Sequence, residues 1–124
     1  MSKTFPITIY HNPGCGTSRT ALETIRAAGY APTVVEYLKV GWTRPQIETL
    51  FKAMGVRPRD VLRRKGSLAT ELGLTEPSAS DDQILDAMVA NPVLVERPIV
   101  VTPLGALLAR PADRVASLLR AAPG

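Results

Sequence analysis

The sequence predicts an α/β fold in a single domain, and three observations support that prediction. Stretches rich in β-branched and aromatic residues alternate with stretches whose apolar residues recur at helical spacing. The chain has 124 residues, which is a common size for one domain and enough to bury a core without disulfides. No charge run or Pro/Ser-rich linker marks a boundary, so we expect residues 1–124 to form a single domain.

The first part of the chain predicts a β-α-β unit. Residues 5–10 (FPITIY) have the composition of a strand, and residues 11–16 (HNPGCG) form a loop of turn-forming residues. Helical periodicity begins at Thr17, and Gly29 is suited to end that helix. Residues 33–38 (TVVEYL) read as a second strand. The intervening stretch allows a right-handed helical crossover between parallel strands.

The middle of the chain, from about residue 43 to 91, predicts a helical insertion within the same domain. Thr43 is suited to be the N-cap of one helix, and a shorter helix is expected at about residues 58–64. Residues 80–83 (SDDQ) match the capping-box pattern, which predicts the start of another helix.

The last part of the chain predicts a β-hairpin followed by a helix. Residues 99–102 read as a short strand, residues 103–105 as a turn, and residues 106–109 as the returning strand. Pro111 is suited to begin a last helix. The predicted order is therefore β-α-β, helices, β-β-α.

Composition excludes several classes of protein. The single cysteine, Cys15, excludes intramolecular disulfides and zinc sites built from several cysteines, and the single histidine, His11, excludes His-rich metal sites. We therefore expect no metal site. Lysine and arginine total 15 against 11 acidic residues, a net charge of +4, but no cationic block predicts nucleic-acid binding.

The pattern along the chain also bears on location. No apolar run reaches the roughly 18 residues that span a bilayer, so we expect no membrane association. Met1-Ser2-Lys3-Thr4 leads directly into the first predicted strand without a signal-peptide core. We expect a reducing, cytoplasmic setting.

Cys15 lies where the first strand ends and the first helix begins, the favoured place for a ligand site in an open α/β sheet. The free N–H groups and partial positive charge of a helix N-terminus stabilise a thiolate and lower its pKa. Gly14 and Gly16 leave the neighbouring backbone bare, so an anion can approach it. The alternative is a buried structural cysteine.

Two other polar residues lie close to Cys15 in the sequence. His11 precedes it by four residues, and an imidazolium there would favour the thiolate; alternatively the ring only packs at a strand end. Ser18 follows Cys15 by three residues, and its hydroxyl could donate to the sulfur or simply cap the helix.

The arginines cannot be placed by spacing alone. Eleven of the cationic residues are arginines, which suit oxyanion recognition as well as solvated helix faces. Arg97-Pro98 directly precedes the third predicted strand, and X-Pro is the common context for a cis peptide bond. A cis bond there would form a tight turn near the cysteine loop.

Several segments together resemble one family, the glutaredoxin-linked arsenate reductases. Residues 11–19 (HNPGCGTSR) resemble its active-site segment. The family's later motifs are matched, in order, by residues 61–63 (VLR), 71–74 (ELGL), 97–105 (RPIVVTPLG) and 110–111 (RP). The resemblance extends from about Thr8 to Leu119.

The resemblance implies a thioredoxin-like core with a mixed four-stranded sheet and a helical insertion. It also implies that Cys15 is the nucleophile that attacks arsenate, tuned by His11 and Ser18. The implied oxyanion-binding residues are Arg63, Arg97 and Arg110, and the implied cis-proline is Pro98.

The resemblance further implies an external electron source, glutathione and glutaredoxin, with glutathione as a co-substrate and no bound cofactor. Redox-sensing regulators of the same superfamily use a Cys-x-x-Cys pair, whereas Ser18 occupies the second position here. Two alternatives remain open at this stage: a related thiol oxidoreductase with a different substrate, and a non-enzymatic redox protein that binds the transcription machinery.

Overall fold

The computed structural model describes residues 5–119, and the chain divides into two compact units. The first unit comprises Met1–Tyr37 with Arg97–Gly124, and the second comprises Leu38–Glu96. The expectation about Met1-Ser2-Lys3-Thr4 lies outside the described residues. That residues 1–124 form one domain stays a prediction.

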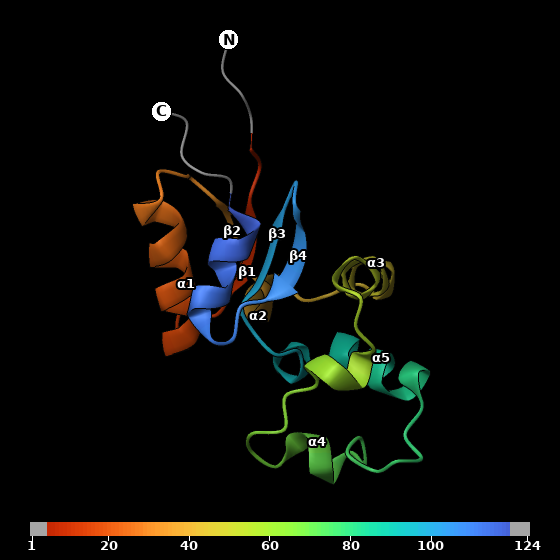
Figure 1. Ribbon diagram of the computed structural model, residues 1–124. Helices are drawn as coiled ribbons and strands as arrows, with labels where there is room; N and C mark the ends of the chain where they lie inside the picture. The colour runs from red at the N-terminus through yellow and green to blue at the C-terminus, as the bar shows by residue number, and fades with distance from the viewer. Residues whose placement is uncertain (1–4, 120–124) are drawn as a thin grey trace. The chain divides into compact units, whose positions relative to one another are not determined.

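The first unit is built on a four-stranded mixed sheet, as expected (Figure 1). Its spatial order is β2-β1-β3-β4. The β1–β2 pair is parallel, and the β1–β3 and β3–β4 pairs are antiparallel. The strands are β1 (Thr8–His11), β2 (Thr33–Glu36), β3 (Ile99–Thr102) and β4 (Gly105–Leu108). The order predicted for the two ends of the chain is confirmed, except that the last helix is the 3-10 segment Ala112–Leu118 rather than an α-helix.

Two helical segments cover one face of this sheet (Figure 1). They are α1 (Gly16–Ala27), which crosses from β1 to β2, and the 3-10 segment η3 (Ala112–Leu118). A buried apolar cluster lies between them and the sheet: Ile7, Ile9, Ala21, Leu22, Ile25, Val100, Ala109, Val115 and Leu118. Burial of this cluster fixes where α1 begins relative to the end of β1.

The second strand is shorter than the sequence predicts. It ends at Glu36, and Tyr37–Val40 form the short helix α2, which is followed by Gly41 at φ 76°. The expectation that the strand extends to Leu38 is therefore wrong. Only Tyr37 of this helix is buried, whereas Leu38 is 43% exposed, so the apolar composition of the segment could not place the end of the strand.

The second unit is helical, as expected for the insertion. Its elements are α3 (Arg44–Met54), η1 (Pro58–Val61), α4 (Leu68–Glu71), α5 (Asp81–Ala90) and η2 (Pro92–Leu94). The caps predicted at Thr43 and Ser80 are confirmed, because each side chain accepts a hydrogen bond from the backbone three residues later. No helix in the described part of the chain is long and apolar enough to cross a membrane.

The helix predicted at residues 58–64 is wrong beyond Val61. Leu62 instead forms an isolated antiparallel bridge with Val95. The flanking bonds run from Arg63 N–H to the Leu94 carbonyl at 2.7 Å and from Glu96 N–H to the Val61 carbonyl at 2.8 Å. This long-range pairing replaces local helical bonds, and local spacing could not reveal it.

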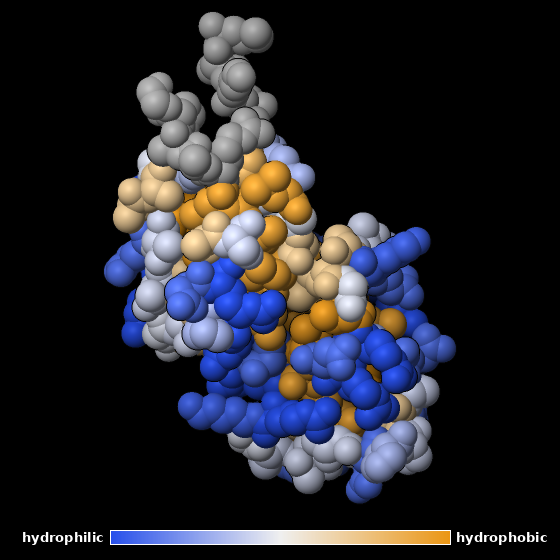
Figure 2. All heavy atoms as spheres, in the orientation of Figure 1, coloured by the Kyte–Doolittle hydropathy of each residue, from blue (hydrophilic) through white to orange (hydrophobic). Residues whose placement is uncertain are grey.

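Arg44 joins two helices of the second unit. Its guanidinium binds Glu48 at 3.1 Å on α3, and Asp86 at 2.6 Å and Asp82 on α5. Hydrophilic side chains are prominent over these helices on the face that Figure 2 shows.

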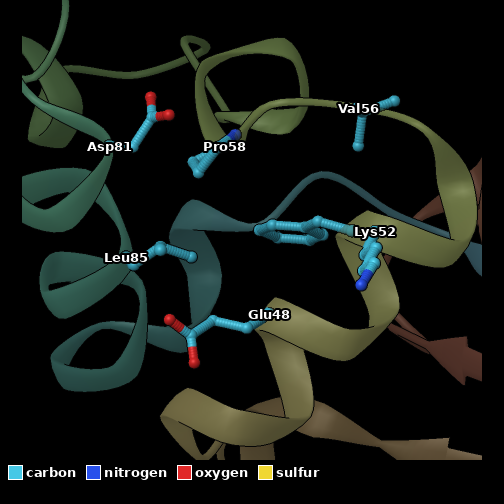
Figure 3. A pocket seen from close by; sticks show the side chains of 7 residues that line it. Glu48, Lys52, Val56, Pro58, Asp81 and Leu85 are labelled. Atoms are coloured by element: carbon cyan, nitrogen blue, oxygen red, sulfur yellow. The ribbon is translucent and has the colours of Figure 1, made fainter.

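A pocket of about 200 Å³ lies within the second unit, between α3, η1 and α5 (Figure 3). Apolar side chains, including Pro58 and Leu85, line it together with charged groups at its rim. The rim carboxylates of Glu48 and Asp81 are already held by arginines. The pocket therefore reflects how these helices pack, and we assign it no ligand.

Ile9 has no exposed surface and lies on β1 within the core of the first unit. Replacement Ile9→Ala should lower the free energy of unfolding by about 2–5 kcal/mol, since it leaves a cavity behind the sheet. Leu104→Ala, at the exposed hairpin tip, is the matched control and should change it by less than about 0.5 kcal/mol. Urea unfolding followed by circular dichroism measures both, and equal effects would contradict this view of the core.

Candidate active site

Cys15 is the N-cap residue of α1 and directly follows the loop that leaves β1. Its backbone is extended, with φ −102° and ψ 121°, and its side chain is half-buried. The predicted position of the thiol, between the end of a strand and the start of a helix, is confirmed. The sulfur is therefore next to N–H groups that have no partner inside the helix.

Opposing effects act on the Cys15 thiol, and their net result is a pKa below its usual value. Burial is the largest single effect and raises the pKa, because it disfavours the charged thiolate. The backbone N–H of Ser18, the guanidinium of Arg110, the backbone N–H of Thr17 and the guanidinium of Arg97 all lower it. The thiolate, which is the nucleophilic form, is thereby favoured.

Arg97 and Arg110 lie beside the sulfur, although both are remote from it in the sequence. Arg110 Nη1 is 3.8 Å from Cys15 Sγ and donates to the Arg97 carbonyl at 3.0 Å. Arg97 is only 6% exposed. The Arg97–Pro98 peptide bond is cis, as expected, and so is Arg110–Pro111. Two of the three predicted arginines are thus brought together with the thiol.

Arg63, the third predicted arginine, lies in the second unit. Its Nη1 donates to Glu96 Oε1 at 3.1 Å, and both side chains are largely buried. The Leu62–Val95 bridge brings these two side chains together. A role for Arg63 in binding an oxyanion stays a prediction.

His11 is buried at the end of β1, with 6% of its surface exposed. Its Nδ1 lies 2.6 Å from Ser18 Oγ. Desolvation by burial is the main effect on the ring and lowers its pKa; the charges of Arg26 and Arg19 lower it further, and Glu36 partly opposes them. The neutral ring is therefore favoured at neutral pH, which differs from the imidazolium considered above.

The Ser18 hydroxyl neither donates to the sulfur nor caps the helix, the two roles expected from the sequence. Besides meeting His11, it accepts a hydrogen bond from Asn12 N–H at 3.1 Å. The hydroxyl thus ties the start of α1 to the end of β1. It is the Ser18 backbone N–H, rather than the hydroxyl, that lowers the pKa of the Cys15 thiol.

Asn12 shapes the loop, a role that was not expected from the sequence. Its Oδ1 accepts from Gly14 N–H at 2.9 Å, and its carbonyl accepts from Cys15 N–H at 3.0 Å. The N–H groups of Gly14 and Cys15 are consequently unavailable to an anion. The first backbone N–H group in this loop that can donate to an anion is that of Gly16. The Asn-Pro-Gly sequence is the available signal, because asparagine forms such side-chain turns.

Within residues 5–119, no group of three or more His, Cys, Asp or Glu side chains is placed to hold a metal ion. The site consists of one thiol, guanidinium groups and backbone N–H groups, which together favour a nucleophilic attack on an oxyanion. The class that this fold and site define is a thioredoxin-like protein with a single half-buried cysteine beside arginines.

Comparison with known proteins identifies the family. The sequence profile of the ArsC family matches residues 10–118. An arsenate reductase of Synechocystis sp. is 57% identical over 113 residues, covering 91% of this chain and 81% of the relative. An arsenate reductase of Escherichia coli K12 is 48% identical, with 91% of this chain and 80% of that protein covered.

A solved structure agrees with these sequence comparisons. The arsenate reductase from Vibrio cholerae matches with a TM-score of 0.90 and 36% identity, covering 94% of this chain and all of that chain. This protein belongs to the ArsC family.

Replacing Arg110 should reduce the reactivity of the thiol. Arg110→Gln removes the cation that lies 3.8 Å from Sγ, so the pKa of Cys15 should rise and alkylation at neutral pH should slow severalfold. The pH dependence of iodoacetamide alkylation measures this change. Arg114→Gln, at an exposed position on η3, is the control. A pKa that falls, or stays the same, in Arg110→Gln would refute the assignment.

Glu36 faces His11 across the parallel β1–β2 pair, in register with it. Its negative charge raises the pKa of the ring, so Glu36→Gln should lower that pKa further. NMR titration of the ring protons gives the answer directly, because the chain has one histidine. Glu23→Gln, at an exposed position on α1, should leave the midpoint unchanged. A higher midpoint in Glu36→Gln would contradict the prediction.

Proposed function

We propose that this protein reduces arsenate to arsenite, with Cys15 as the nucleophile. The observation that carries the proposal is the pair of guanidinium groups at a thiol whose pKa is lowered. Membership of the ArsC family and relatives named as arsenate reductases support arsenate as the substrate.

In the first step, the Cys15 thiolate attacks the arsenic atom. A sulfur–arsenic bond forms and an arsenic–oxygen bond breaks, and the oxygen leaves as water after protonation. The product is a covalent thiolate–arsenic(V) adduct. Arg97, Arg110 and, by prediction, Arg63 hold the arsenate oxygens and stabilise the negative charge that develops on them.

An external thiol must supply the electrons, because the chain has one cysteine. In our proposal glutathione displaces a second water and joins the arsenic through its sulfur. A glutaredoxin thiol then attacks the glutathione sulfur, so that a disulfide forms and the electron pair of the broken sulfur–arsenic bond reduces arsenic to the +3 state. Water finally displaces the Cys15 sulfur and releases arsenite.

The remaining residues of the site support this reaction without touching arsenic. His11 and Ser18 hold the start of α1 against the end of β1, and Gly16 offers the first open N–H group. Gly14, whose N–H is bound by Asn12, serves the shape of the loop. Pro98 holds the chain in its turn ahead of β3. Dependence on a cellular thiol fits the reducing cytoplasm, and no bound cofactor is needed.

Arsenite production tests the proposal. The purified protein with arsenate, glutathione and glutaredoxin should form arsenite, and Cys15→Ser should abolish turnover while its circular dichroism spectrum is unchanged. Omission of glutathione or of glutaredoxin should also prevent turnover, since no internal thiol can replace either one.

Other outcomes would favour the alternatives. Reduction of small disulfides without any arsenite formation would indicate a thiol oxidoreductase with another substrate. Capture of RNA polymerase by a protein inactive on both substrates would indicate a partner-binding role. Unfolding of Cys15→Ser would favour a structural cysteine.

A further inference from the structure

Arg19 lies on the first turns of α1, four residues after Cys15, and is exposed. Its side chain folds back toward the cysteine loop, because Nη1 donates to the Pro13 carbonyl at 2.7 Å. One end of the guanidinium is thereby fixed to the loop. An arginine held in this way loses less conformational entropy when it binds a ligand than a free surface arginine does.

Gly16 gives the guanidinium access to the backbone beside the thiol. A Cβ atom at Gly16 would lie 3.7 Å from Arg19 Nη2, so this nitrogen lies over the residue that directly follows Cys15. The charge of Arg26 lowers the pKa of His11 more than the charge of Arg19 does, so this effect does not distinguish the two arginines. What distinguishes Arg19 is the position of its guanidinium over Gly16.

The arginines around Cys15 differ in their depth. We call Arg97 and Arg110 the inner layer and Arg19 the outer arginine. Arg97 is buried and Arg110 is half-buried at the sulfur, whereas Arg19 is exposed together with Pro13, Gly14 and Gly16. An oxyanion held by the inner layer leaves the outer arginine open to a second molecule that arrives from solvent.

Arg19 differs from three arginines of the second unit in its partners, and it shares the lack of an ion pair with Arg26 among the described residues. Arg44, Arg57 and Arg63 each form an ion pair with at least one carboxylate. Among residues 5–119, no carboxylate forms an ion pair with Arg19, and its hydrogen bond goes to a neutral carbonyl. Its positive charge is not neutralised within the described part of the chain.

We propose that Arg19, lying over Gly16, binds a carboxylate of the thiol co-substrate and so directs that thiol to the sulfur side of the site. This inference deepens the proposed function and rests on it, since it concerns the external thiol that the reaction requires. Glutathione carries carboxylates at both ends, and a guanidinium binds a carboxylate through parallel hydrogen bonds. Thiols without a carboxylate gain nothing from Arg19.

Thiol exchange at Cys15 tests this subsite without arsenate. Cys15 is first converted to its mixed disulfide with 2-thiopyridine, an uncharged chromophore. The attacking thiol forms a bond to Cys15 Sγ, the bond to the thiopyridyl sulfur breaks, and 2-thiopyridone leaves with the proton. The rate is measured with glutathione and with β-mercaptoethanol, which has no carboxylate.

Arg19→Gln should lower the rate with glutathione about two- to fivefold, the range expected for one exposed charge pair, and leave the rate with β-mercaptoethanol unchanged. The difference should shrink at high salt. Arg26→Gln removes the same charge at another exposed position of α1, seven residues and about 10 Å further along the helix, and should alter neither rate.

Two results would overturn the inference. An equal loss with both thiols would show that Arg19 acts on the reactivity of Cys15 through the loop, and an unchanged glutathione rate would show that no carboxylate is bound. The ratio of the two rates separates these cases.

Arsenate turnover then separates this inference from the proposed function. Arg19→Gln should raise the KM for glutathione and leave the KM for arsenate unchanged. Carboxylate-selective exchange in a protein that forms no arsenite would refute the proposed function alone. Arsenite formation without that selectivity would refute the subsite alone.

Discussion

Burial of the Cys15 sulfur disfavours its negative charge, and the first unit is arranged so that this cost is more than offset. Two kinds of group lower the pKa of Cys15, and they differ in how far they lie from it in the sequence. The N–H groups of Thr17 and Ser18 are local, because they follow the cysteine in the same helical turn. The guanidinium groups of Arg97 and Arg110 belong to the part of the first unit that follows the second unit in the sequence. A thiolate therefore depends both on where α1 begins and on how β3 and β4 close the sheet beside β1.

The polar residues behind the thiol hold the cysteine loop in place and do not add positive charge to the site. His11 is desolvated and favours its neutral form, and its ring meets the Ser18 hydroxyl, which also accepts from the Asn12 backbone. Asn12 in turn takes the N–H groups of Gly14 and Cys15. This chain of hydrogen bonds fixes the loop on its inner side. It also decides which N–H groups remain for an oxyanion, beginning with Gly16.

In the proposed reaction, the single cysteine requires an external thiol that approaches from solvent. The burial pattern around the loop fits that requirement, because Arg97 is buried and Arg110 half-buried at the sulfur, whereas Arg19 lies at the surface. Arg63, in the second unit, already donates to Glu96, so an arsenate oxygen bound there would share its guanidinium with that carboxylate. The partners and exposure of each arginine must therefore be considered together with its charge.

The sequence by itself determined the features that depend on neighbours within a few residues. These include the strand, loop and helix around Cys15, the capping boxes at Thr43 and Ser80, and the hairpin of β3 and β4, since caps and turns are local hydrogen-bond patterns. The family resemblance named the arginines, but no spacing rule could place Arg97 and Arg110 at the sulfur. The tertiary structure decided that placement, the Leu62–Val95 bridge, and the register of Glu36 beside His11. Each of these contacts joins residues far apart in the chain, so it forms only when the sheet pairs or a unit closes, and no local pattern encodes it.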